Sequence, residues 1–252
     1  MMLLLALGGD VTTAPSTFTF DHGGIIRGDV SKKQIALIFT GGDFGEGADH
    51  VLTVLQNQNV PASLFITGDF LRKPTLLASV RKFIANGHYV GPHSDKHPLY
   101  CPWDDREKSL LSETDFRADL QKNIDDLRAL GALSDATKPV LFIPPYEWFN
   151  SDQTAWAKKM NVLLFNFTPG SGSNRDWAPE DHKSFVPSKK IIADILAYEQ
   201  KDPHGLNGFL LLLHVGSQRK DKTFLMLEDL VTELKKRGYD FVRIDELLPL
   251  SQ

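Results

Sequence analysis

The chain has 252 residues, a formal net charge of −4 and 42% apolar residues, an ordinary balance for a folded globular protein. No long cluster of Lys and Arg is present, so the sequence argues against nucleic-acid binding. The single cysteine, Cys101, excludes an internal disulfide and a zinc site built from several cysteines.

The chain opens with MMLLLALGGD, whose apolar run is seven residues long and has no Lys or Arg before it. This run is too short to cross a bilayer, and it is a poor signal peptide. We expect no membrane span in the rest of the chain either. Residues 1–33 are predicted to form an extended lead-in that packs on or near one domain, residues 34–252.

From residue 34 onward, short β-branched and apolar runs alternate with helical spacing. Seven runs predict strands, at 34–40, 62–68, 89–94, 139–145, 162–168, 208–216 and 240–244. Helical patterns lie between them, at 47–59, 75–87, 114–131, 152–160, 189–201 and 223–237. This alternation predicts an α/β fold, a parallel sheet with helical crossovers. Seven units favour a single-domain, distorted (β/α) barrel over an open sheet.

Polar residues follow the ends of these predicted strands. In barrels the chemistry gathers at the C-terminal ends of the strands, so these residues are the candidates for a site. They are Asp43, Glu46, His93, His97, Tyr146, Glu147, Asn166, Thr168 and His214.

The stretch HSDKH, residues 93–97, places two histidines four positions apart. If it forms a helical turn, His93 and His97 lie on one face and can share a metal ion. Asp43 is the first carboxylate after the strand at 34–40, and it would complete a set of two histidines and one carboxylate. Zn²⁺ suits these ligands, with Co²⁺ or Ni²⁺ as alternatives.

Each of these residues also has a purely structural interpretation. A His-x-x-x-His pair alone is more often a surface feature, and Asp43 could cap the helix that begins near residue 47. His214 could be a hydrogen-bonded core histidine. The joint placement at strand ends favours the functional interpretation.

In their order along the chain, these motifs resemble the polysaccharide deacetylases, the family-four carbohydrate esterases. That family has a strand ending in Thr-Phe-Asp-Asp-Gly, then His-Ser/Thr-x-x-His, Arg-Pro-Pro-Tyr-Gly, Asp-x-x-Asp-Trp and a late Leu-x-Leu-x-His strand. The resemblance covers about residues 34–248. HSDKH is complete, and LLLLH at 210–214 fits the last motif. TFTFDHGG at 17–24 superficially resembles the first motif, but the expected helix and strand do not follow it in register.

Three motifs depart from the family pattern. NRDW keeps Asp176 and Trp177, with Ser173 in the place of the first Asp. FIPPYE keeps Tyr146, but Ile143 replaces the Arg and Glu147 replaces the Gly. The first motif, LIFTGGDFGEG, lacks the Asp-Asp pair altogether.

The resemblance implies a role for each matched residue. Asp43, after a local two-residue shift, would bind the metal with His93 and His97. His214 would protonate the leaving group, with Asp176 orienting its ring. The backbone N–H of Tyr146 would help to hold the oxyanion, and Trp177 would form an apolar wall for the acetyl group or sugar. Trp148, with Trp103 and Tyr100, would either stack on sugars or pack within loops.

In the family the first Asp is the general base and the Arg pairs with it. Here Thr40 or Gly42 takes the place of that base, and Ile143 takes the place of the Arg. The loss of the Asp and the Arg together is physically consistent, because burying an Arg without its carboxylate partner costs free energy. Glu147 is the first candidate for a substitute base, and Glu46 is the second.

These residues predict a metal-dependent hydrolase that removes acetyl groups from a polysaccharide or oligosaccharide, attached through nitrogen or oxygen. The alternative is a catalytically silent carbohydrate-binding relative that retains the metal site but lacks the base. A structural barrel with an incidental histidine pair is a third interpretation. The expected partner is an acetylated carbohydrate, and the resemblance favours a secreted or periplasmic location. The oligomeric state stays open.

Overall fold

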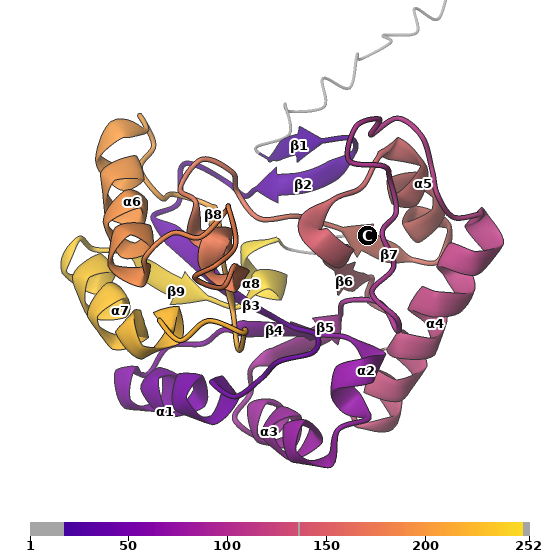
Figure 1. Ribbon diagram of the computed structural model, residues 1–252, viewed down its shortest axis with the longest axis horizontal. Coiled ribbons are helices and arrows are strands. Elements are labelled where there is room, and N and C mark those ends of the chain that lie inside the picture. Colours follow the sequence, from indigo (N-terminus) through magenta and orange to yellow (C-terminus); the bar gives the residue numbers. More distant parts are fainter. Residues whose placement is uncertain (1–17, 136, 249–252) are drawn as a thin grey trace, which may run out of the picture.

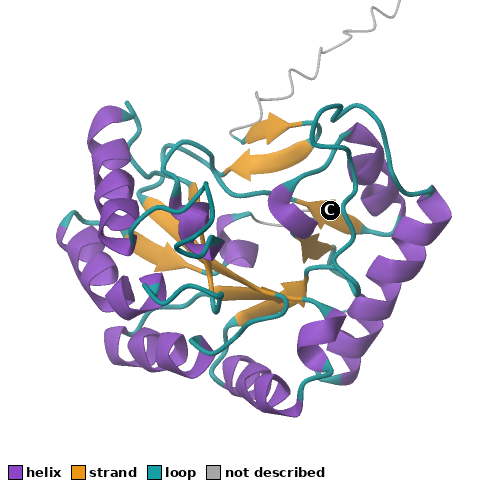
Figure 2. Ribbon diagram, viewed as in Figure 1, coloured by secondary structure: helices purple, strands orange, loops and turns teal. Residues whose placement is uncertain are grey.

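The structure, a computed structural model, describes residues 18–135 and 137–248. A layer of helices surrounds a set of mostly parallel strands (Figures 1 and 2). No helix within these ranges is long and apolar enough to cross a membrane. The opening stretch MMLLLALGGD lies outside the described residues.

All seven strands expected from the sequence are present. They are β3 (Gln34–Gly41), β4 (Ser63–Ile66), β5 (Tyr89–Pro92), β6 (Val140–Phe142), β7 (Val162–Leu164), β8 (Phe209–His214) and β9 (Asp240–Val242). One parallel sheet has the order β5-β4-β3-β8, with β9 also on β3, and β6 pairs with β7. The ladders form two separate sheets rather than one continuous ring, so the barrel is distorted, as predicted.

Helices connect the strands where the sequence pattern placed them. The six expected segments correspond to α1 (Ala48–Gln58), α3 (Pro74–Ala85), α4 (Glu113–Ala129), α5 (Ser151–Lys159), α6 (Ser188–Lys201) and η3 (Thr223–Met226) with α7 (Leu227–Lys236). The short elements α2 (Gly68–Leu71), α8 (Ile244–Leu247), η1 (Pro145–Glu147) and η2 (Ser173–Trp177) were not expected. They contain at most five residues each, too few for a periodic pattern.

Alternation along β3 separates the two sides of the sheet. Ile35, Leu37 and Phe39 pack in the core that the helices share. Ala36 and Ile38 instead pack inside the barrel, with Leu210 and Leu212 of β8. Because side chains alternate along a strand, Thr40 and His214 continue this inner face, and the two residues are register partners.

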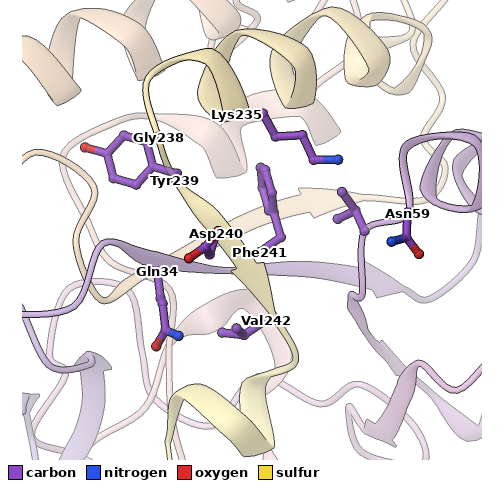
Figure 3. A pocket seen from close by; sticks show the side chains of 9 residues that line it. Gln34, Asn59, Lys235, Gly238, Tyr239, Asp240, Phe241 and Val242 are labelled. Carbon is purple, nitrogen blue, oxygen red and sulfur yellow. The ribbon is translucent and has the colours of Figure 1, made fainter.

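One edge of β3 is shared by two strands. β9 pairs with residues 34–36 and β4 with residues 38–41, while β8 takes the other edge. A cavity of about 580 Å³ lies at the N-terminal ends of β3 and β9, lined by Gln34, Asn59, Lys235, Tyr239 and Asp240 among others (Figure 3). It is at the end of β3 opposite to Thr40, the end that serves stability in such barrels.

The lead-in contains a β-hairpin, which the sequence analysis missed. β1 (Thr19–Asp21) and β2 (Gly24–Arg27) pair antiparallel, joined by left-handed residues at His22 and Gly23. Ile25 forms a parallel bridge with Phe165, just after β7. Residues 19–24 of this stretch therefore belong to a hairpin that precedes β3.

Candidate active site

His93 and His97 converge, although the turn between them is not the expected helix. The loop at 93–97 contains two left-handed residues, Ser94 (φ 71°) and His97 (φ 54°), so the helical expectation is wrong. The two Nε2 atoms nevertheless lie 3.2 Å apart. A loop turn brings the imidazoles together as closely as a helical turn would.

Helix α4 fixes this loop through two polar side chains that the sequence analysis did not single out. The fully buried Asn123 accepts a hydrogen bond from the backbone N–H of His93 at 3.0 Å. The carboxylate of Asp119 accepts from the backbone N–H groups of Asp95 and Lys96 at 3.0 and 2.9 Å. The signal for Asn123 was its position on the buried stripe of α4, where a polar residue needs a partner.

Both imidazoles are neutral near pH 7. Burial, with the charge of His97, places the pKa of His93 well below its usual value. Burial, with the charge of His214, lowers the pKa of His97 to about 4, although the charge of Asp43 opposes this shift. His93 Nδ1 lies 2.9 Å from the carbonyl oxygen of Ile143, which can only accept, so Nε2 of the neutral ring carries the lone pair.

The carboxylate of Asp43 does not join the pair. β3 continues without a bulge to Gly41, so the following loop carries Asp43 outward, where its side chain is 82% exposed and lies 3.7 Å from Lys73 Nζ. Asp43 does not cap α1 either, because Gly47 is the N-cap residue. Asp43 still lies on the same side of the molecule as His97, since the two groups interact electrostatically.

The structure brings together two of the three predicted metal ligands, and the metal site itself stays a prediction. Two neutral Nε2 atoms 3.2 Å apart fit two adjacent ligand positions of a divalent ion. Among the described residues, no three His, Cys, Asp or Glu side chains are grouped to hold a metal. The third ligand that the sequence predicted is not in place.

His214 and Asp176 form a tight ion pair at the inner end of β8. Asp176 Oδ1 lies 2.6 Å from His214 Nδ1, and Asp176 Oδ2 accepts the backbone N–H of His214 at 2.9 Å. Burial lowers the pKa of His214, but the charge and hydrogen bond of Asp176 and the charge of Glu147 outweigh it, so the pKa is raised. His214 therefore holds its proton more strongly than a free imidazole does.

Glu147 faces this pair from η1. Burial raises the pKa of its carboxyl to about 7, and the charge of Asp176 adds to this while that of His214 opposes it. Glu147 also has a left-handed backbone, with φ 53°. This is the position where the resembling family has Gly, which adopts such a φ without strain. A carboxylate at this position costs stability twice, through backbone strain and through burial.

Glu46, the second candidate for the base, is engaged elsewhere. Its carboxylate forms an ion pair with Lys222 and accepts the backbone N–H of Ser217 at 3.1 Å. Burial raises the pKa of Glu46, but these hydrogen bonds lower it by a larger amount, so the net shift is downward. Glu46 is thus a weaker proton acceptor than Glu147.

Of the aromatic residues that the sequence singled out, Tyr146 contacts a histidine of the pair. The ring of Tyr146, which is 46% exposed, lies 4.4 Å from that of His97. Trp177 is 43% exposed, and its ring lies 4.8 Å from that of His182. Trp148 is half-buried, and Tyr100 is fully buried, which settles the role of Tyr100 as packing.

Thr40 and Ile143 fill the inner face near His214. Ile143 is buried in the cluster inside the barrel. The hydroxyl oxygen of Thr40 is buried and has no hydrogen-bond partner within the described part of the chain. Thr40 is the register partner of His214, so this unpaired hydroxyl belongs to the strand ends at which His214 lies.

Arg219 fixes the segment that carries Asp176. Its side chain is 1% exposed and donates to the carbonyl oxygens of Ala178 (3.1 Å) and Val186 (2.7 Å). An ion pair with Asp221, at 3.2 Å, compensates the guanidinium charge. Arg219 thus ties the loop after η2 to the loop after β8, a role that sequence spacing did not indicate.

Comparisons with known proteins show which proteins this chain is similar to. The family model described as polysaccharide deacetylase matches residues 27–164. A peptidoglycan-N-acetylglucosamine deacetylase of Bacillus cereus is 26% identical, with 86% of this chain and 89% of that protein covered.

Two solved structures share the fold. A chitin deacetylase from Colletotrichum lindemuthianum has a TM-score of 0.69 at 18% identity and covers 94% of both chains. A family-four pseudoenzyme from Bacillus anthracis also has a TM-score of 0.69, at 22% identity, and covers 91% of this chain and 70% of that one.

We predict that Arg219→Met lowers the free energy of unfolding by about 3 kcal/mol, because it leaves buried carbonyl oxygens and Asp221 without a donor. Chemical denaturation measures this change. The control is Arg175→Met, which alters an exposed arginine of the same segment and should shift stability by less than about 0.5 kcal/mol. Equal losses in both variants would contradict the role of Arg219.

A second prediction concerns the pH dependence of stability. Because the folded-state pKa of Glu147 is raised, the contribution of its carboxyl to the free energy of unfolding is favourable below about pH 4.5. That contribution is lost as the pH rises towards 7. Glu147→Gln should therefore raise the melting temperature relative to the wild type by more at pH 8 than at pH 5. Thermal melts without added metal test this, with the exposed Glu228→Gln as control. A pH-independent difference would show that Glu147 titrates normally.

Proposed function

The chain belongs to the polysaccharide deacetylase family, and from this membership and the geometry of its site we propose that it hydrolyses acetyl groups on a carbohydrate. One observation carries the proposal. The carboxyl of Glu147 interacts electrostatically with the His214–Asp176 pair, and this group lies beside two neutral histidines. The names of its relatives support an extracytoplasmic location, secreted or periplasmic.

A divalent metal, most readily Zn²⁺, would fit the Nε2 atoms of His93 and His97 once the neutral His97 ring carries its proton on Nδ1. Asp43 is the proposed third ligand, because its charge already acts on His97 and its exposed carboxylate forms an ion pair with Lys73 that can be exchanged for a metal. When bound, the metal would polarise the acetyl carbonyl and lower the pKa of a water molecule.

The chain's own residues supply the proton transfers. Glu147 takes a proton from the attacking water, for which a pKa of about 7 suits it. The N–H of Tyr146, at the start of η1 where helical N–H groups lack a partner in the helix, donates to the oxyanion. His214 gives its proton to the departing nitrogen or oxygen as the acyl bond breaks, and acetate and a free amine or hydroxyl result.

The remaining polar and aromatic groups position the substrate. Asp176 holds the imidazole of His214 in one tautomer and orientation. Thr40, rather than Gly42, takes the place of the family's base, because β3 reaches Thr40 in register with His214. Its hydroxyl cannot act as a base near pH 7, but it can donate a hydrogen bond to the substrate. Trp177 provides the exposed apolar wall.

A catalytically silent carbohydrate-binding protein is the second candidate. The absence of an acidic residue at Thr40 and the outward side chain of Asp43 favour it. Acetate release from acetylated xylan, chitin oligomers and small aryl acetates, with and without zinc or cobalt, separates the two. Turnover that depends on metal supports the hydrolase. Sugar binding without turnover on any of these substrates supports the silent protein.

Glu147→Gln is expected to lower kcat/KM by about 100-fold or more, because it removes the proton acceptor. Metal content, measured by elemental analysis, should stay the same. The acidic limb of the wild-type pH profile, which we expect near pH 7, should disappear in this variant. Glu46→Gln is the matched control, since Lys222 already holds that carboxylate. A Glu147→Gln rate equal to that of the wild type would exclude Glu147 as the base.

His97→Ala is expected to abolish both metal binding and activity, because one of only two preplaced nitrogens is lost. Calorimetric titration with zinc measures the first effect, and acetate release the second. His50→Ala, at an exposed histidine of α1, is the control and should bind zinc as the wild type does. Full activity in His97→Ala would refute the metal site.

A further inference from the structure

An exposed tryptophan lies close to the histidine pair. Trp103 is 62% exposed, the most exposed large apolar side chain among the described residues. It lies in the long loop between β5 and α4, and the proposed chemistry does not use it. An exposed aromatic surface next to a site indicates a binding surface.

Trp103 belongs to a row of rings that begins at the histidine pair. The ring of Tyr146 contacts that of His97 at 4.4 Å, and the ring of Trp103 meets that of Tyr146 edge-on at 5.8 Å. Trp148 stacks on Trp103, with ring centroids 5.9 Å apart and planes inclined by 27°. One face of Trp103 is therefore supported by Trp148, and much of the rest of its surface is open to solvent.

The support beneath Trp103 is fixed in place. The indole N–H of Trp148 donates to the carbonyl oxygen of Pro102 at 3.2 Å. The guanidinium of Arg106 lies over the Trp148 ring, 4.4 Å from its centroid, and is held by Asp21 at 2.8 Å. The three-layer stack of Trp103, Trp148 and Arg106 is thus built before any ligand arrives, which lowers the entropy cost of binding.

We propose that Trp103, supported by Trp148, is a subsite for a neutral pyranose ring adjacent to the sugar whose acetyl group reacts. This inference rests on the proposed function, because the subsite would hold the same oligosaccharide. The C–H groups on one face of a pyranose carry partial positive charge and match the negative face of an indole. Two successive ring contacts link Trp103 to His97, so the subsite adjoins the reacting position.

The flanking charges indicate the class of sugar. Asp104 and Asp105 follow Trp103 directly, and both are exposed. Their carboxylates can accept hydrogen bonds from sugar hydroxyls, but they repel acidic sugars. The nearby Arg106 does not offset them, because its charge is paired with Asp21. We therefore expect neutral chains to bind better than uronic-acid chains.

The test compares binding of the mono- and tetrasaccharides of N-acetylglucosamine by calorimetry or NMR titration. In the wild type the tetrasaccharide should bind more tightly than the monosaccharide. Trp103→Ala should reduce this advantage about tenfold, and Trp103→Tyr, which keeps an aromatic face, should retain most of it. Trp103→Leu, which keeps apolar area without an aromatic face, should resemble the alanine variant. Acetylated oligogalacturonide should bind more weakly than the neutral tetrasaccharide.

The outcomes separate the subsite from the hydrolysis. Oligosaccharide binding through Trp103 without acetate release would leave the subsite standing and overturn the hydrolytic function. Equal tetrasaccharide advantage in the wild type and Trp103→Ala would overturn the subsite, even if acetate is released. A wild type that binds the tetrasaccharide no better than the monosaccharide would also overturn it. Thermal melts of each variant check that it is folded.

Discussion

The ion pair between Asp176 and His214 is the interaction on which the electrostatics of the site depends. Asp176 holds both the ring and the backbone N–H of His214, and it raises the pKa of that imidazole. The protonated His214 in turn depresses the pKa of His97. The pair thus favours a protonated His214 at the end of β8 and neutral imidazoles in the 93–97 loop. This distribution of charge suits a general acid that lies beside a metal-binding position.

The site is also where the chain accepts strain. Ser94, His97, Tyr146 and Glu147 all have left-handed φ values, and no glycine relieves them. Glu147 adds a carboxyl whose pKa burial raises. Such costs persist where the surrounding structure enforces them, and here Asn123, Asp119 and the packing of η1 do so. The residues that the proposed chemistry uses are therefore the ones that lower the stability of the fold.

The sequence predicted the barrel because short runs rich in apolar and β-branched residues, such as 34–40, alternate with amphipathic helical patterns. Motif order then predicted that His93, His97, Asp176 and His214 belong to one site, and they meet in the structure. The hairpin at 19–27 was missed because it follows antiparallel pairing, which the alternating pattern does not include.

Other features depend on contacts that no local pattern encodes. The outward course of Asp43 depends on where β3 ends, one residue beyond Thr40. The left-handed turn at 93–97 depends on hydrogen bonds that its backbone N–H groups donate to side chains of α4, and Arg219 binds Val186 across more than 30 residues of chain. These long-range constraints, rather than residue type, determine which members of the motifs reach the site.

The most direct test of this account is an NMR titration of the metal-free protein that follows the Glu147 carboxyl and the His214 imidazole. The account predicts a Glu147 pKa of about 7 and a His214 pKa above its ordinary value, with each titration altered when the other group is neutralised. Independent titrations, with Glu147 near 4.5 and His214 near 6.5, would contradict it, because the two groups would then not share one buried site.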